Sequence, residues 1–337
     1  MRRGFICGGS WLVDKNKTID AWPAEEAVAS IVAENAQGGG SGFNMAVDLK
    51  KLDETIPVAA MGLVGDDPEG KFLLEMCRFH GIDRRGLVVD DGAPTSCTDV
   101  YVARYTGKRT FFHRQGANAR LSPDDFDFAD SNARVLHLGL PGLHETLDSP
   151  WGDDPSGWVS VLRRARDAGL ATNLELVSVA PARIADLARP CLPHLDSLIV
   201  NDFEIGAVAG LATLRDGATD IDAVAAAAES VLALGAMGFV AVHFPRGAVL
   251  AARDGTRLRL PSLDVPRSAI AGTNGAGDAY AAGLLYALHQ GAGYDEAMRL
   301  AACVAAASLR AVDTTGAVDI AGNCQALALS WGWGPAI

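Results

Sequence analysis

The sequence predicts an α/β fold in which a mostly parallel β-sheet is covered by helices on both faces. Apolar runs of strand length recur along the chain, at residues 5–7, 134–138, 170–177, 197–200 and 239–242. Helical stretches separate them, and strands that alternate with helices are typical of a mostly parallel sheet. In sheets of this kind the active site lies beyond the carboxyl ends of the strands.

The composition is that of a globular enzyme with a sizeable core. The chain has 337 residues, of which 49% are hydrophobic and 21% charged, and we expect residues 1–337 to form a single domain. The net charge of −12 argues against nucleic acid and against an anionic membrane as partners. Six cysteines are scattered without a Cys-x-x-Cys pair, and no apolar run reaches membrane-spanning length. These features predict a protein of the reducing cytoplasm.

Two glycine-rich turns follow each other in the first fifty residues. The apolar run 5–7 ends at Gly8-Gly9, which permits a tight exit from a strand. Gly38-Gly39-Gly40 allows the backbone to approach a ligand closely, and Asn44 offers a donor and an acceptor for hydroxyl groups. We expect a helix over residues 43–52 that carries Asn44 in its first turn.

Residues 65–72 nearly match a P-loop but are better explained as the start of a helix. Phe72 occupies the place of the Ser or Thr that would bind Mg²⁺, and three acidic residues lie in the loop that would hold phosphate. Acidic residues and a proline such as Pro68 are typical of the first turn of a helix.

A turn of small residues that opens into a helix is the strongest candidate site in the chain. Residues 271–277 include three glycines, and residues 279–285 are rich in Ala and Leu, which favour a helix. The unpaired N–H groups of such a helix start, with the positive end of its dipole, form an anion site. Asp278 would repel a phosphate there, unless its task is to deprotonate a hydroxyl beside a phosphoryl group. The alternative is that Asp278 only complements the helix dipole.

Two motifs give the chain a resemblance to the ribokinase-like carbohydrate kinases of the phosphofructokinase-B type. Residues 272–278, Gly-Thr-Asn-Gly-Ala-Gly-Asp, resemble the C-terminal signature of that family, and residues 39–46, Gly-Gly-Ser-Gly-Phe-Asn-Met-Ala, resemble its N-terminal signature. The resemblance extends from about residue 5 to about residue 317. It implies a three-layer ribokinase-like fold, in which helices flank a central mostly parallel sheet and a small β-strand lid is attached.

The resemblance implies phosphoryl transfer from ATP to a hydroxyl of a sugar-like alcohol, with Mg²⁺ as cofactor. Asp278 would be the base, and the N–H groups of Gly275, Ala276 and Gly277 would hold the charge on the transferring group. The residues that would bind the substrate are Asp14, Gly39, Gly40 and Asn44. Those that would bind the nucleotide are Asn201, Glu204, Arg246, Gly247 and Thr273.

Residues 201–204 have two interpretations. Asn-Asp-Phe-Glu resembles the family's Asn-x-x-Glu motif, in which Glu204 would organise Mg²⁺ and its waters. The same residues are also typical of a capping box at the start of a helix, in which Asn201 caps the helix and the side chain of Glu204 reaches back to the backbone of Asn201. Both interpretations can hold at once.

The resemblance also implies two lid segments, at about residues 16–37 and 95–116. Residues 98–105 and 109–114 flank a glycine turn and predict a β-hairpin from their own pattern. For residues 24–36 the composition permits a helix whereas the resemblance implies strands, and periodicity does not decide between them. Because lid strands in this family often pair between subunits, we also expect a homodimer through the lid.

Four features depart from the family's pattern or bear on the ligand. Gly272 stands where the family commonly has an Asp that helps to form a monovalent-cation site, so a requirement for that cation is left open. Phe244 and Pro245 occupy a turn that is usually richer in glycine. Residues 313–317, Asp-Thr-Thr-Gly-Ala, resemble the signature but lack the Gly-Asp and helix after it, so we interpret this likeness as a coincidence. Residues 38–46 contain no Lys or Arg, which favours an unphosphorylated sugar or sugar acid.

Two alternatives stand beside a sugar kinase. A nucleoside or vitamin-type kinase of the same fold would have a more apolar, aromatic-lined substrate pocket. A non-catalytic regulator that binds a sugar or nucleotide is the other, although the retained Asp278 argues against it.

Overall fold

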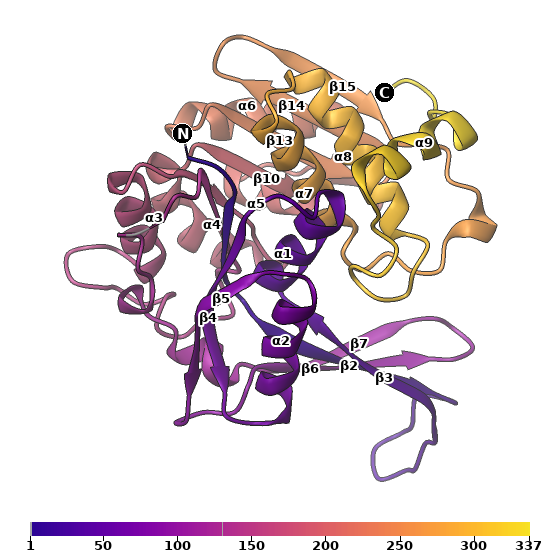
Figure 1. Ribbon diagram of the computed structural model, residues 1–337. Coiled ribbons are helices and arrows are strands. Elements are labelled where there is room, and N and C mark those ends of the chain that lie inside the picture. Colours follow the sequence, from indigo (N-terminus) through magenta and orange to yellow (C-terminus); the bar gives the residue numbers. More distant parts are fainter. Residues whose placement is uncertain (1, 130) are drawn as a thin grey trace.

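The computed structural model describes residues 2–129 and 131–337, without the side chain of Arg109. The strands of its main sheet are β1 (Phe5–Gly9), β4 (Val58–Gly65), β5 (Asp83–Asp90), β8 (Val135–Gly139), β9 (Ala171–Leu174), β10 (Ser197–Asn201), β13 (Phe239–Phe244), β14 (Gly247–Ala252) and β15 (Arg257–Pro261). They lie in the order β15-β14-β13-β10-β9-β8-β1-β4-β5 (Figure 1). The strands from β13 to β5 pair in parallel, and β14 and β15 are antiparallel to their neighbours. The expected mostly parallel sheet is confirmed.

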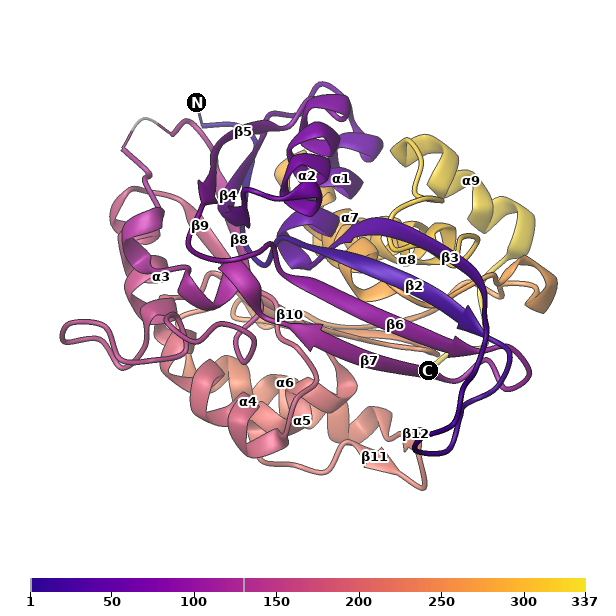
Figure 2. The ribbon, with the colours of Figure 1, turned by 90° about the horizontal axis from the view of Figure 1, so that it is seen from below.

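Helices cover both faces of this sheet (Figure 2). One face carries α1 (Ser41–Leu52), α2 (Pro68–Phe79), α7 (Ala276–His289), α8 (Tyr294–Ser308) and α9 (Ala321–Trp331), and the other carries α3 (Gly157–Asp167), α4 (Pro181–Ala188), α5 (Asp202–Ala209) and α6 (Ile221–Leu234). Side chains of β1 alternate between the two cores, because Phe5 and Cys7 belong to one and Ile6 to the other. Within the described residues, we find no helix with the length and apolarity that a membrane crossing requires.

A second sheet extends from the body beyond the carboxyl end of β1 (Figures 1 and 2). This small sheet consists of β2 (Leu12–Ile19), β3 (Ile31–Gly39), β6 (Cys97–Ala103) and β7 (Arg109–Arg114), in the order β3-β2-β6-β7. A helix over residues 24–36 is wrong, because residues 31–39 form a strand that hydrogen-bonds along β2. The remaining short elements are β11 (Leu214–Arg215), β12 (Ala218–Thr219) and the 3₁₀ turns η1 (Gly116–Arg120), η2 (Pro123–Asp125), η3 (Arg189–His194) and η4 (Arg267–Ala269).

Local signals placed the starts of several helices correctly. The helix expected over residues 43–52 is α1, and the near-match to a P-loop is the start of α2, where the side chain of Asp67 accepts a hydrogen bond from the N–H of Gly70 at 2.8 Å. The strand expected over residues 170–177 is shorter, because β9 ends at Leu174. The strands β14 and β15 and the helix α9 were not predicted.

The chain reverses its direction across the sheet at β1. From β1 it proceeds to β4 and β5 on one side, and it later returns to β8 on the other side and continues outward to β13. Ligands in α/β sheets bind at such a point, outside the carboxyl ends of the strands. The N–H of Ser10 donates to the carbonyl of Gly139 at 2.7 Å and ties the ends of β1 and β8 together there.

Candidate active site

The turn before α7 has a shape that glycine adopts most easily. Gly275 precedes the helix with φ of 75°, and a Cβ at this position would lie 2.3 Å from the carbonyl oxygen of Thr314. Since Gly275 carries no side chain, it does not cap the helix. The first N–H groups of α7 therefore face outward at the positive end of the helix dipole, which is the arrangement of an anion site.

Asp278 lies in the first turn of α7 and contacts two polar side chains. The Nδ2 of Asn44 donates to its Oδ2 at 2.9 Å, and its carboxyl group is in hydrogen-bonding contact with that of Glu175. Burial raises the pKa of Asp278 well above its usual value, and the charge of Glu175 raises it further. A carboxyl group of raised basicity beside an anion site is suited to deprotonating a hydroxyl.

Asn44 is buried, and both ends of its amide are used. Its Oδ1 accepts a hydrogen bond from the hydroxyl of Thr314 at 2.8 Å, while its Nδ2 holds Asp278. The carbonyl of Thr314 also packs behind Gly275. Residues 313–317, whose likeness to the signature we interpret as a coincidence, therefore have a structural role that sequence analysis missed, because this segment supports both Asn44 and the turn before α7. Lys51 fixes the segment in turn, since its Nζ donates to the carbonyl of Thr315 at 2.5 Å.

Asp14 faces the same site from the small sheet. It lies opposite Gln37 on β3 and Thr98 on β6, and residues paired in this way point to the same side of a sheet. His113 on β7 continues the row, with its Nδ1 3.1 Å from the hydroxyl of Thr98. Burial raises the pKa of Asp14 to about 6; the hydrogen bond from Thr98 opposes this, and the charge of Asp278 adds to it. Sequence analysis missed Gln37, Thr98 and His113 as candidate site residues, because only the register of the strands shows that they lie in one row with Asp14.

Gly39 and Gly40 lie where a side chain does not fit. A Cβ at Gly39 would lie 2.4 Å from the Oδ2 of Asp14. Gly40 immediately precedes α1 with φ of 86°, and a Cβ there would lie 2.6 Å from the carbonyl oxygen of Ser10. These glycines allow β3 and α1 to approach the end of β1 closely, and they bring Asn44 to Asp278.

A cavity of about 600 Å³ lies on the other side of the α7 turn. Its wall includes Asn201, Thr273 and Gly277, and much of the rest is apolar, including Leu263, Val265, Ile270, Ala302 and Leu309. His243, which sequence analysis missed, also lines the cavity, and a Cβ at Gly277 would lie 2.9 Å from its Cε1. Burial lowers the pKa of His243 to about 4, so the ring is neutral at pH 7. The volume and the mixed lining suit a nucleotide.

Asn201 and Glu204 form a capping box at the start of α5. The Oδ1 of Asn201 accepts from the N–H of Glu204 at 2.8 Å, and the Oε2 of Glu204 accepts from the N–H of Asn201 at 3.1 Å. The hydroxyl of Ser178 donates to the other carboxylate oxygen at 3.0 Å. Burial raises the pKa of Glu204. The capping interpretation is therefore confirmed, and a metal role for Glu204 stays a prediction.

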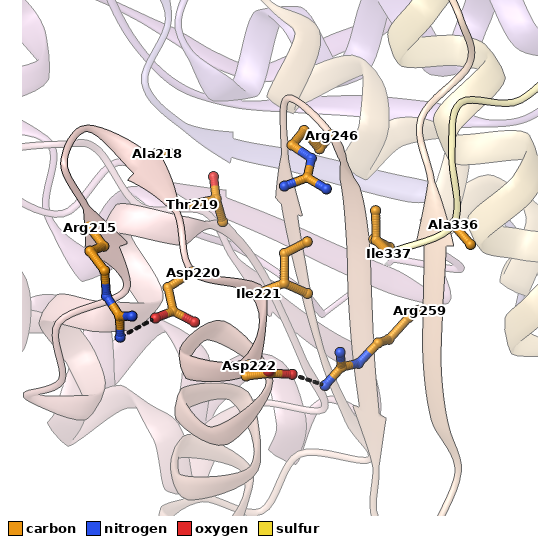
Figure 3. Close-up of a pocket in the computed structure, with 10 residues that line it drawn as sticks. All are labelled: Arg215, Ala218, Thr219, Asp220, Ile221, Asp222, Arg246, Arg259, Ala336 and Ile337. Carbon is orange, nitrogen blue, oxygen red and sulfur yellow. Dashed lines mark hydrogen bonds and ion pairs between the residues drawn. The ribbon is translucent and has the colours of Figure 1, made fainter.

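Arg246 lies apart from this cavity, in a neighbouring pocket of about 530 Å³ (Figure 3). Arg215 and Arg259 line the same pocket, and each forms an ion pair with an aspartate. Gly247, the next residue, does line the 600 Å³ cavity. The structure thus brings together the residues predicted for the substrate and for the reaction, and it brings Asn201, Thr273 and Gly247 to one cavity, but Arg246 does not join them.

Comparisons with known proteins match nearly the whole chain. Residues 14–321 match the family described as pfkB family carbohydrate kinase. The chain is 26% identical over 296 residues to an adenosine kinase of Schizosaccharomyces pombe, a match that covers 84% of both chains. It is 28% identical over 305 residues to a 1-phosphofructokinase of Rhodobacter capsulatus, covering 86% of this chain and 84% of the relative.

Solved structures show the same fold. A ribokinase of Thermotoga maritima superposes with a TM-score of 0.79 at 22% identity, over 97% of this chain and 99% of the other. An Arabidopsis thaliana ribokinase, solved in complex with ribose and ATP, gives the same TM-score and coverage at 21% identity. The expected ribokinase-like fold is confirmed.

Proposed function

This chain belongs to the pfkB family of carbohydrate kinases, and on that premise we propose that it transfers the γ-phosphoryl group of ATP to a hydroxyl of an unphosphorylated sugar or sugar acid. The observation that carries the proposal is Asp278, a carboxyl group of raised basicity in the first turn of a helix whose N–H groups form an anion site. Because the family consists of kinases, a non-catalytic regulator is set aside.

Each part of the site has a task in this reaction. The acceptor hydroxyl passes its proton to Asp278 as its oxygen bonds to the γ-phosphorus, and the bond from that phosphorus to ADP breaks. The N–H groups of residues 275–277 stabilise the charge on the transferring group. Asn44 orients the Asp278 carboxylate, and Asp14 accepts hydrogen bonds from other hydroxyls of the acceptor.

The 600 Å³ cavity would hold ATP, with Asn201, Thr273 and Gly247 in its wall. Mg²⁺ would offset the charge of the phosphates. Glu204 would contact the water molecules around this ion and not the ion directly, because both of its carboxylate oxygens already accept hydrogen bonds from protein groups. No cluster of three or more His, Cys, Asp or Glu side chains able to hold a metal occurs in the described part of the chain. This arrangement is compatible with Mg²⁺, which usually keeps several water molecules and is bound mainly by the phosphates of the nucleotide.

The small sheet supports an acceptor without a phosphate group. The row that faces the site consists of Gln37, Asp14, Thr98 and His113, none of which carries a fixed positive charge. Lys15 and Lys17 point to the opposite side of β2, where they pair with Glu69 and Asp99. Burial lowers the pKa of His113, so this ring also is neutral at pH 7.

A nucleoside is the second candidate acceptor. A second row of paired residues lies two positions along the strands from Asp14, on the same side of the small sheet. In this row Val100 on β6 pairs with Asn16 on β2 and with Phe111 on β7. This row offers an apolar surface on which a base could stack. It is the one observation of the site that favours a nucleoside over a sugar.

A screen for ATP consumption separates these acceptors. The purified protein is given ATP, Mg²⁺ and single members of three groups: neutral sugars, keto-sugar acids and nucleosides. We expect turnover with a sugar or sugar acid. Turnover with nucleosides alone would identify the second candidate, and ATP consumption with none of them would contradict the proposed function.

The first prediction concerns the acceptor pocket. Asp14→Ala and Asn44→Ala should each weaken sugar binding by about tenfold per lost hydrogen bond and lower turnover, with the affinity for ATP nearly unchanged. Isothermal calorimetry with the sugar and with ATP measures both affinities. The matched control is Asp99→Ala, which removes a carboxylate from the opposite side of the same sheet and should leave sugar binding intact. Normal sugar binding in both site variants would show that the pocket is assigned wrongly.

The second prediction separates the two roles of Glu204. If it organises Mg²⁺, Glu204→Gln should raise the Mg²⁺ concentration needed for half-maximal activity with little change in melting temperature. If it serves only in the capping box, the variant should lose about 1 kcal/mol of stability with unchanged Mg²⁺ dependence. Activity titrations with Mg²⁺ and thermal unfolding distinguish these outcomes.

We also propose that the protein works in the cytoplasm as a homodimer formed through the small sheet. Its six cysteines are all free and buried, as expected in a reducing compartment. On the small sheet, Trp22 and Phe112 stack with their ring centroids 6.4 Å apart, and about half of each side chain is exposed. A second copy would cover this aromatic surface. Sedimentation equilibrium tests the proposal, and a monomer at micromolar concentration would contradict it.

A further inference from the structure

The carboxyl group of Glu175 touches Asp278 and has no task in the reaction described so far. Glu175 immediately follows β9, whose carboxyl end lies at the edge of the sheet where the site is built. Its backbone N–H donates to the carbonyl of Leu138 at 2.9 Å, which fixes it beside the end of β8. Its side chain reaches Asp278 in the first turn of α7.

A row of buried polar side chains supports Glu175 from behind. The hydroxyl of Ser197 on β10 donates to the Oδ1 of Asn173 on β9 at 3.0 Å. The Nδ2 of Asn173 lies 3.0 Å from the Nδ1 of His137 on β8 and donates to it. Burial lowers the pKa of His137 to about 4, so the ring is neutral. Because its Nδ1 accepts, the single ring proton is on Nε2.

That proton faces Glu175. The Nε2 of His137 lies 2.9 Å from the Oε2 of Glu175, although the N–H is not well aligned with the oxygen and the contact is not a full hydrogen bond. Glu175 is also in hydrogen-bonding contact with the carboxyl group of Asp278. Two carboxylates in contact repel each other when both are ionised, so a hydrogen bond between them requires one proton.

The surroundings favour retention of this proton at neutral pH. The groups that face the pair from the elements around it are Asp14 on β2, Asp48 on α1, Glu204 on α5, Cys7 on β1 and the neutral His137 on β8. Within the described residues, none of these is a cation that would stabilise two negative charges. Burial, followed by the charge of Glu204, raises the pKa of Glu175 to about 7 despite the opposing hydrogen bond with Asp278.

We propose that Glu175 is a positioning residue for this reaction, which shares one proton with Asp278 and thereby holds the catalytic carboxyl group toward the acceptor hydroxyl. The proposal rests on the proposed function. Asn44 and Glu175 then both contact Asp278, and the buried His137 packs beside Glu175. When the hydroxyl oxygen bonds to the phosphorus and ADP leaves, its proton joins the pair. The pair then carries two protons and returns one to the solvent after the phosphorylated product has left.

The shared proton is tested first by infrared spectroscopy, which needs no acceptor. We expect a protonated carboxyl band in the wild type at pH 7 whose intensity falls by one group in Glu175→Gln and in Asp278→Asn. Asp48 is buried without a hydrogen-bond partner in the described residues and is expected to contribute its own band, which Asp48→Asn identifies. An unchanged band in Glu175→Gln would overturn the proposal, even if the protein proved to be a kinase.

The positioning role is tested by the pH dependence of turnover, measured with the acceptor that the screen identifies. Removing the charge of Glu175 lowers the pKa of Asp278, so the ionised base persists to lower pH. In Glu175→Gln the acid limb of kcat should therefore move down by about one pH unit, and kcat at the optimum should fall about tenfold with the KM for ATP unchanged.

The control variant is Ser197→Ala, at the far end of the same buried row. It should lower the melting temperature slightly and leave the acid limb in place. If Glu175 were only structural, Glu175→Gln would behave like Ser197→Ala, and this result would overturn the proposal. Failure of the screen to find an acceptor would instead contradict the proposed function, and the infrared result would still decide whether the proton is shared.

Discussion

Asp278→Asn should lower turnover by about 10²–10⁴-fold and leave the fold intact. Asn is nearly isosteric with Asp, and its side-chain oxygen can still accept the hydrogen bond from the Nδ2 of Asn44. What it loses is the ability to take a proton from the acceptor hydroxyl, and positioned bases typically contribute a factor of this size. The affinity for ATP should hold, because the variant loses the shared proton together with one carboxyl group and the pair keeps a single negative charge, on Glu175. Steady-state kinetics and a nucleotide titration measure both effects.

Asp48→Asn is the matched control for this substitution. Asp48 is a fully buried acid on α1, and it is close enough to Asp278 that the charge of Asp278 raises the pKa of Asp48. It has no hydrogen-bond partner in the described residues, and burial raises its pKa well above the usual value, so Asp48→Asn makes the same replacement at a protonated carboxyl group without removing the base. Turnover of Asp48→Asn should stay within a few-fold of the wild type. If Asp278→Asn retained comparable turnover, Asp278 would be a residue that only complements the helix dipole, and most of the proposed reaction would fall with it.

The parts of the site that sequence analysis predicted are those whose signal is local. Gly275, Asp278 and Asn44 belong to short motifs in which each residue type has a physical reason to be where it is. A turn needs glycine, a helix start exposes N–H groups, and an amide or carboxylate within one turn of that start is held near the ligand. The alternation of apolar strands and helices in the same way predicts a parallel sheet.

The parts that sequence analysis missed depend on contacts between distant segments. Thr314 holds Asn44 across a separation of 270 residues, and nothing in the composition of residues 313–317 indicates this. Glu175 reaches Asp278 only because β9 ends at Leu174, which its apolar run did not predict. Gln37, Thr98 and His113 come into one row through strand register, and register is set by the whole of the small sheet.

Residues 24–36 show the same limit at the level of secondary structure. Their composition permits a helix, and the local preference is weak compared with what strand pairing supplies. The strand β3 forms because Ile31–Gly39 pairs along the length of β2, and six of its nine residues are exposed and gain little from burial. A segment whose conformation depends on a neighbouring strand cannot be assigned from its own pattern.

Gly275→Ala should cause the second large loss of activity, through the anion site. The φ of 75° costs an L residue about 1–2 kcal/mol, and the new Cβ would lie 2.3 Å from the backbone of Thr314, so the turn must move. Displaced N–H groups no longer match the transferring phosphoryl group, and the loss of one such donor typically costs about 10²–10³-fold in turnover. The affinity for ATP should fall as well, in contrast to Asp278→Asn.

Gly291→Ala is the control that distinguishes damage to the anion site from the strain of placing an alanine in a left-handed backbone conformation. Gly291 has φ of 93°, and a Cβ there would meet nothing within 4 Å, so this variant carries the strain of the left-handed region without displacing a neighbour. It should lose a similar amount of stability and keep normal kinetics. Thermal unfolding of both variants, followed by kinetics at a temperature where both are folded, compares them directly. If Gly275→Ala lost no more turnover than Gly291→Ala, the N–H groups of residues 275–277 would not be the site that stabilises the transferring group.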